Sequence, residues 1–213
     1  MDQSKTGDVR PASDVAFTPA VKAIQERRGS RAVYHKMETT RGWRTTVTPE
    51  LAAFIAERDS VFLATSNALG QPYIQHRGGP KGFIRVLDEK TLAFADFAGN
   101  RQYITTGNLT ENDRAFLFMM DYAHQRRFKI WGHARVVEND PDLINRLMPT
   151  GYDATPEQVM LFTIEAWDTN CHQHIPRMVN VALVADAIEH AERRIAELEA
   201  ENAKLKQELA AKH

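Results

Sequence analysis

The chain has 213 residues, 43% of them hydrophobic, which is enough for one medium-sized domain and an appendage. Its net charge of −1 argues against a nucleic-acid-binding protein, because such proteins usually carry a basic excess. The single Cys171 excludes an internal disulfide and fits a reducing compartment. Residues 1–16 lack the apolar core of a signal peptide, and no apolar run approaches the ~20 residues that span a bilayer. We therefore expect a cytoplasmic protein that contacts neither membranes nor nucleic acids.

Residues 1–47 predict an N-terminal arm, loose up to about residue 17, that carries one short helix. A threonine followed by a proline is a typical N-cap and first-turn pair, and it occurs at Thr18 and again at Thr48. The first helix is expected to end at Gly29. The second is expected to run to about Arg58, with apolar residues at core spacing.

The body of the chain reads as a series of short strands. The predicted strands cover residues 61–66, 72–76, 83–87, 91–95, 115–121, 126–138 and 159–167, with a helical piece beginning near Asp140. Strands at this spacing without alternating helices favour an antiparallel barrel over a Rossmann sheet. The fold class is therefore α+β, mainly β, with short flanking helices.

Two polar corners of this body are rich in cations and glycine: Arg77-Gly-Gly-Pro-Lys-Gly82 and Asp96-Phe-Ala-Gly-Asn-Arg101. Such corners suit a bound phosphate, because arginine donates two parallel hydrogen bonds and glycine lets the backbone approach closely. The first corner lacks the Gly-Lys-Ser/Thr ending of a P-loop. On these residues alone, an ordinary barrel corner stays open as the alternative.

The C-terminal residues 181–212 predict a parallel dimeric coiled coil. Position a of the heptad falls on Val181, Ile188, Ile195, Asn202 and Leu209, and position d on Val184, Ala191, Leu198 and Leu205. An asparagine at position a favours two parallel strands in register. A lone amphipathic helix that lies on its own domain is the alternative.

The order of these motifs, followed by Arg126-Arg-Phe-Lys-Ile-Trp-Gly132, resembles the pyridoxamine 5′-phosphate oxidase-like family. More narrowly, it is similar to the branch of predicted flavin-nucleotide-binding proteins, to which the segment Asn170-Cys-His-Gln-His-Ile-Pro-Arg177 belongs. The resemblance covers residues 48–178. It implies a split β-barrel that forms a homodimer and holds FMN in two clefts at the subunit interface.

The same resemblance implies which residues bind the cofactor. Arg77 matches the arginine that opens the flavin-contacting strand. Asn100 and Arg101 match the basic pair that grips the phosphate, although only one of the two is a cation here. Arg127 stands where the oxidases commonly carry a glutamine that faces the flavin. The full set of expected cofactor-binding residues is Arg77, Gly78, Lys81, Ala95, Asp96, Asn100, Arg101, Arg127 and Trp167.

We therefore expect an FMN-dependent oxidoreductase that acts on a small molecule. Pyridoxamine phosphate is not the expected substrate, because the oxidase's C-terminal signature is absent. No side chain is predicted as a catalytic acid or base, and the cluster of Cys171, His172 and His174 has too few ligands to predict a metal site. Two alternatives remain: a flavin- or haem-binding carrier or sensor coupled through the coiled coil, and a purely structural dimer adaptor.

Overall fold

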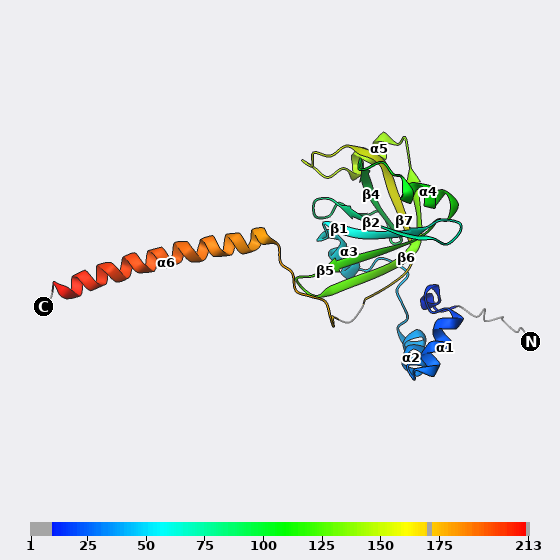
Figure 1. Cartoon of the computed structure of the whole chain (residues 1–213), viewed down its shortest axis with the longest axis horizontal. Coiled ribbons are helices and arrows are strands. Elements are labelled where there is room, and N and C mark those ends of the chain that lie inside the picture. The colour runs from blue at the N-terminus through cyan, green and yellow to red at the C-terminus, as the bar shows by residue number, and fades with distance from the viewer. Residues whose placement is uncertain (1–9, 170–171, 212–213) are drawn as a thin grey trace, which may run out of the picture. The chain divides into compact units, whose positions relative to one another are not determined.

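The structure is a computed structural model that describes residues 10–169 and 172–211 (Figure 1). It divides into two compact units. The first contains the chain up to Asp121 together with Arg126–Gln173, and the second contains Tyr122–Gln125 with the chain from His174 onward.

Seven antiparallel strands form one sheet in the first unit, in the order β2-β1-β5-β6-β7-β4-β3. The strands are β1 Ser60–Ser66, β2 Pro72–Gly78, β3 Arg85–Val86, β4 Thr91–Phe97, β5 Arg114–Asp121, β6 Arg126–Val137 and β7 Pro156–Thr169. The helices of this unit are η1 Ala12–Val15, α1 Pro19–Arg27, α2 Arg31–Thr40, α3 Pro49–Ala56, α4 Ile104–Glu111 and α5 Pro141–Leu147. This arrangement is an antiparallel split β-barrel of the α+β class, as the sequence predicts.

The core of the barrel follows from the two-residue alternation of its strands. Leu63 on β1, Leu117 on β5 and Ile130 on β6 are each 0% exposed. Their sequence neighbours point to the opposite face of the sheet. Leu51 of α3 is equally buried and joins the same core cluster. Each such side chain contributes about 1.5–3 kcal/mol on burial, so the apolar core stabilises the barrel without disulfide bonds.

A bulge in β7 lies opposite the only glycine of β6. Trp131 pairs with Ala166 and Gly132 with Ile164, which leaves Glu165 as an extra residue. A Cβ atom at Gly132 would lie 2.0 Å from the backbone oxygen of Thr163. The backbones therefore approach here more closely than any side chain allows.

The predicted helices that begin after Thr18 and Thr48 are confirmed as α1 and α3, and each threonine hydroxyl accepts the expected backbone hydrogen bond. Helix α2 is absent from the sequence-based prediction. Its N-cap Ser30 makes no side-chain hydrogen bond, and none of its residues is buried. An ion pair between Arg31 and Glu38 links the start of this helix to its last turn.

The prediction of a loose arm is wrong for residues 12–17. Ala12–Val15 form η1, and the segment packs inward: Ser13 is 1% exposed, and the ring of Phe17 lies 5.1 Å from that of Trp43. Trp43 in turn stacks on Trp131 at 4.7 Å, so the N-terminal segment covers part of the outer face of β6. Residues 1–9 lie outside the described part of the chain.

β3 and β7 differ most from the predicted bounds, and the other strands agree within two residues at each end. β3 is limited to Arg85–Val86, and Phe83 and Ile84 ahead of it are buried in the core without pairing in the sheet. β7 begins three residues earlier than expected, at Pro156. Between β3 and β4, Asp88 accepts a hydrogen bond from the backbone N–H of Lys90, and this bond lowers the pKa of the Asp88 carboxyl.

The second unit is dominated by α6, a 30-residue helix that spans Val181–Ala210. The predicted coiled-coil segment is therefore helical over its described length. None of the helices in the described ranges combines the length and the apolar character that crossing a bilayer requires.

Candidate functional site

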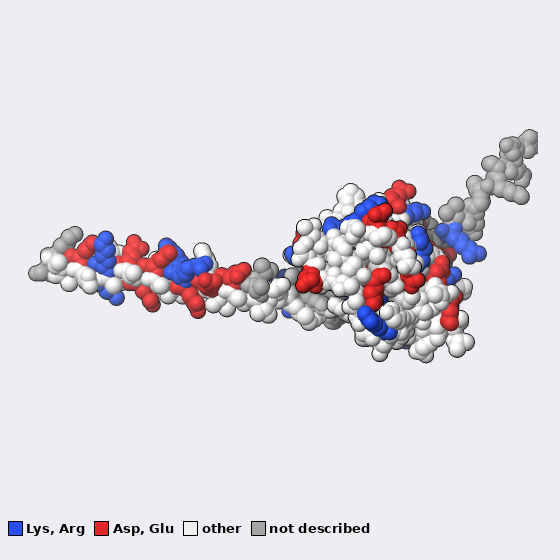
Figure 2. All heavy atoms as spheres, turned by 90° about the horizontal axis from the view of Figure 1, so that it is seen from above, with Lys and Arg blue, Asp and Glu red and all other residues white. Residues whose placement is uncertain are grey.

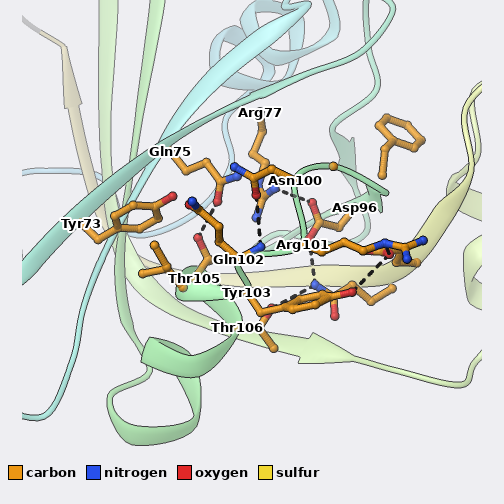
Figure 3. Close-up of a pocket in the computed structure, with 15 residues that line it drawn as sticks. Tyr73, Gln75, Arg77, Asp96, Asn100, Arg101, Gln102, Tyr103, Thr105 and Thr106 are labelled. Atoms are coloured by element: carbon orange, nitrogen blue, oxygen red, sulfur yellow. Dashed lines mark hydrogen bonds and ion pairs between the residues drawn. The ribbon is translucent and has the colours of Figure 1, made fainter.

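The main polar pocket of the barrel lies where β2, β4, the start of β7 and the first turn of α4 meet (Figure 3). Its cavity volume is about 40 Å³, and the pocket opens to solvent. The loop between β4 and α4 forms one wall. Both polar corners that the sequence singles out contribute to this pocket, Arg77 from the first and Asp96, Asn100 and Arg101 from the second.

The floor of the pocket is an ion pair between Arg77 on β2 and Asp96 on β4, whose side chains point toward each other in Figure 3. An Arg77 Nη1 lies 3.0 Å from an Asp96 carboxylate oxygen, and the side chains are 15% and 7% exposed. Asp96 also accepts a hydrogen bond of 2.8 Å from Gln158 Nε2. β2 and β4 lie toward opposite ends of the strand order, so closure of the barrel brings this pair together.

Arg77 keeps one buried donor unused. Its Nε atom is buried and has no hydrogen-bond partner among the described residues. Leaving a buried polar donor unpaired costs about 1–3 kcal/mol, so this atom favours an additional acceptor in the pocket.

The loop into α4 has an unusual backbone conformation where it lines the same space. Arg101 and Tyr103 both have positive φ, 57° and 52°, which is uncommon for residues other than glycine. The side chain of Asn100 accepts a hydrogen bond of 3.2 Å from the backbone N–H of Gln102 and so holds the turn. α4 has no side-chain cap, and Ile104 is among the residues that line the pocket. Its first-turn N–H groups and partial positive charge therefore favour an anion.

The side-chain charges of the pocket balance. Arg101 lies 3.5 Å from Glu157, and the Tyr103 hydroxyl donates to the same carboxylate at 3.4 Å. Each arginine thus already has a carboxylate partner, Arg77 with Asp96 and Arg101 with Glu157. Because Arg101 is 71% exposed, it remains free to turn toward a stronger anion.

Hydroxyl and amide groups complete the wall. Thr105 Oγ1 donates to Gln75 Oε1 at 2.9 Å, and Gln158 Nε2 donates to Thr106 Oγ1 at 3.1 Å. These bonds tie α4 to β2 and to β7, so the first turn of the helix has a fixed position in the pocket.

A second hollow, with a cavity volume of about 200 Å³, adjoins the first and shares Arg77 and Asp96 with it. Gly78, Phe83 and Ala95 line it, and it therefore has a more apolar wall than its neighbour. A charged end beside a more apolar end suits a ligand that has an anionic group attached to an aromatic ring system.

Comparison with known proteins identifies the family. A family model described as pyridoxamine 5′-phosphate oxidase matches residues 47–171, more than half of the chain. The chain belongs to the pyridoxamine 5′-phosphate oxidase family. The sequence matches no curated protein.

Solved structures similar to this member of the family share little sequence identity with it. HupZ of Group A Streptococcus is 20% identical with a TM-score of 0.47, over 62% of this chain and 99% of that chain. An FMN-binding protein from Syntrophomonas wolfei is 12% identical with a TM-score of 0.44, over 70% and 97%. An FAD-binding protein from Mycobacterium smegmatis is 12% identical with a TM-score of 0.40, over 60% and 97%.

The structure brings six of the nine predicted cofactor residues to the two hollows. Arg77, Asp96, Asn100 and Arg101 line the first, and Gly78 and Ala95 line the second. Lys81 is instead 68% exposed and pairs with Glu57 at 3.1 Å, outside both linings.

The remaining two predicted residues lie elsewhere in this family member. Trp167 is 5% exposed, and its indole N–H donates to the backbone oxygen of Thr46 at 2.8 Å, so the ring belongs to the core. Arg127 is half-buried on the outer face of β6 and lines neither hollow. A single copy of the chain therefore does not place these two side chains beside Arg77.

Sequence reasoning missed several polar residues of the pocket. Tyr73 and Gln75 share the face of β2 that carries Arg77, so strand alternation could have identified them. Glu157 and Gln158 belong to the early part of β7, ahead of the predicted strand, which begins at residue 159. Among the described residues, no three His, Cys, Asp or Glu side chains gather in a way that could hold a metal ion. Cys171 lies outside those residues.

Proposed function

We propose that this protein is a homodimeric oxidoreductase that uses FMN to act on a small molecule other than pyridoxamine phosphate. The observation that carries the proposal is the donor set of the polar pocket. Arg77 with its unused Nε, Arg101 with its exposed head and the uncapped start of α4 all line this pocket. All three are donors, and together they match a phosphate, which offers several acceptor oxygens and nearly two negative charges.

The two hollows also fit the two halves of FMN. The first would hold the phosphate through Arg77, Arg101 and the backbone of α4. The second, lined by Gly78 and Ala95, would hold the ring system. Bound FMN supplies hydride transfer, while the protein supplies position and electrostatics. The residues of this chain would bind the phosphate, orient the ring and keep water from the apolar wall.

The dimer in this proposal is supported by the outer face of β1, β2 and β5. Cross-strand pairing places Phe62 beside Phe118 and Ala64 beside both Phe116 and Ile74. Ile74 is 59% exposed, and the two phenylalanines on β5 are only half-buried. Such an apolar face on the outside of a barrel favours burial against another protein, and a second copy of this chain is the occupant that we propose.

Arg127 lies on the same side of the sheet as this apolar face, since it pairs across β5 with Met120, two residues beyond Phe118. In a dimer built on that face, Arg127 would meet the second copy rather than the pocket of its own chain. Arg127 would then contact the flavin bound by the second copy, which explains why it lies outside the pocket that contains Arg77 of its own chain.

The decisive experiment is the absorption spectrum of the protein as purified, followed by mass analysis of any small molecule that it releases. A flavin spectrum that is bleached by NADH or NADPH supports the oxidoreductase. A flavin spectrum that neither nicotinamide bleaches supports a carrier or sensor, the second candidate, which the long exposed helix α6 favours. A Soret band would assign haem to the site. Colourless protein that does not bind FMN on titration would contradict the proposal.

A further inference from the structure

Helix α6 carries a stripe of large apolar side chains that is exposed along its whole length. Val181, Ile188, Ile195 and Leu209 occupy position a of the heptad, and Val184, Leu198 and Leu205 occupy position d. These seven side chains are between 40% and 81% exposed. Figure 2 shows uncharged atoms along the helix between acidic and basic side chains. A stripe with a period of 3.5 residues fits the narrow seam of a coiled coil.

We propose that α6 binds α6 of a second copy of this chain as a parallel, two-stranded coiled coil. The occupant is identified by the charges that flank the stripe. In a parallel pair, Arg194 lies beside Glu199 of the second copy, and Glu201 lies beside Lys206 of the second copy. Both contacts join opposite charges, and symmetry repeats each of them once.

The antiparallel arrangement is less favourable by the same reasoning. When Ile195 packs against Leu198 of the second copy, Arg194 still meets a glutamate, Glu201. However, Glu192 then meets Glu199, and this contact between like charges also occurs twice. The flanking charges therefore select the parallel orientation.

Asn202 supports the same choice. At position a of a parallel pair it faces Asn202 of the second copy, so the two amides can hydrogen-bond within the seam. In the antiparallel pair it faces Ala191, and its amide is buried without a partner. In the single copy, Asn202 lines a shallow hollow with Ile195 and Leu198, which is the kind of hole that a side chain of a second helix fills.

Parallel pairing has a consequence for the barrels. It places the two Val181 residues at the same end of the coil, so each barrel is attached to that end through a short segment. Tethering of this kind raises the local concentration of one barrel near the other to about the millimolar range. While the helices are paired, a barrel interface with a dissociation constant below that range would be occupied whatever the protein concentration. This consequence rests on the proposed two-copy site, whereas the pairing of the helices does not.

Disulfide cross-linking of the full-length chain tests the pairing without any flavin. In a Cys171→Ser background, Leu205→Cys places a thiol at position d, and mild oxidation is followed on non-reducing gels. In a parallel coil the two thiols face each other, and we expect covalent dimer to form at least tenfold faster than for Gln207→Cys. Gln207 occupies the outward position f and serves as the matched control.

The opposite outcomes are equally clear. In the antiparallel pair the two copies of residue 205 would lie about 25 Å apart along the coil axis, and a Leu205→Cys chain would instead cross-link to an Ile188→Cys chain. That result overturns the parallel orientation. If Leu205→Cys forms covalent dimer no faster than Gln207→Cys and no mixed dimer appears, the helix does not pair with itself.

Discussion

Replacement of Arg101 by alanine separates the phosphate from the rest of the proposed ligand. Its side chain is 71% exposed, and its carboxylate partner Glu157 lies 3.5 Å away. Exposed ion pairs contribute about 0–1 kcal/mol, so the variant should keep its fold. A hydrogen bond to a charged group contributes about 1.5–3 kcal/mol, which corresponds to a loss of about 10- to 150-fold in FMN affinity. Riboflavin lacks the phosphate, so its affinity should change by less than about twofold.

The assay is a titration of flavin fluorescence at fixed ionic strength, with FMN and riboflavin as parallel ligands. Arg193→Ala is the matched control, because Arg193 is 61% exposed and pairs with Glu189 at 2.8 Å on α6. It removes the same charge from a residue outside the pocket and should leave both affinities unchanged. Equal losses for FMN and riboflavin in Arg101→Ala would show that Arg101 does not hold the phosphate.

Three further experiments test the pocket and the barrel. Glu157→Gln removes the carboxylate that competes for Arg101, so FMN should bind about threefold tighter or more, while riboflavin binding should not change. Arg77→Met leaves the buried Asp96 without its cation and should lower the free energy of unfolding in urea by about 3 kcal/mol. Adding Asp96→Leu removes the unpaired charge and should restore at least half of that loss. If the second substitution restores nothing, the ion-pair argument is wrong. Gly132→Ala should lower the free energy of unfolding by about 3 kcal/mol or more, because its Cβ would overlap a backbone oxygen. The control Gly107→Ala in α4 meets no atom within 4 Å and should raise the free energy of unfolding by about 0.5–1 kcal/mol. Both are measured by thermal unfolding, and equal effects would refute the close approach of β6 to β7.

Several strands were predictable because they have a clear two-residue alternation of buried and more exposed positions. β6 shows this best: Phe128 and Ile130 are fully buried, while Lys129 between them is not. Helix α2 was not predictable, because Ser30 makes no cap and the helix buries no residue of its own. Its position depends on contacts of Arg31 and Glu38 with residues distant in sequence, such as Ser13.

The site was predictable only in part, for a related reason. The corners that contain Arg77 and Arg101 are visible as local clusters of charge and glycine. The pairing of Arg77 with Asp96 depends on closure between two strands that lie far apart in the sheet order. The contribution of Glu157 likewise depends on which residue begins β7. Local patterns thus indicated where a phosphate could bind. The closed barrel adds that Arg77 and Arg101 each already pair with a carboxylate.

Two separate surfaces of this chain have the character of an interface with a second copy. One is the apolar outer face of the barrel around Phe62 and Phe118, and the other is the stripe on α6. If the barrel face alone held two copies together tightly, the proposed pairing of α6 would add little to the assembly. The length of α6 and its self-complementary charges are therefore best explained by a weak interface between the barrels. A site that needs Arg127 from the second copy would then be complete only while the two α6 helices are paired. Pairing of α6 would therefore control how much of the protein is able to bind its cofactor.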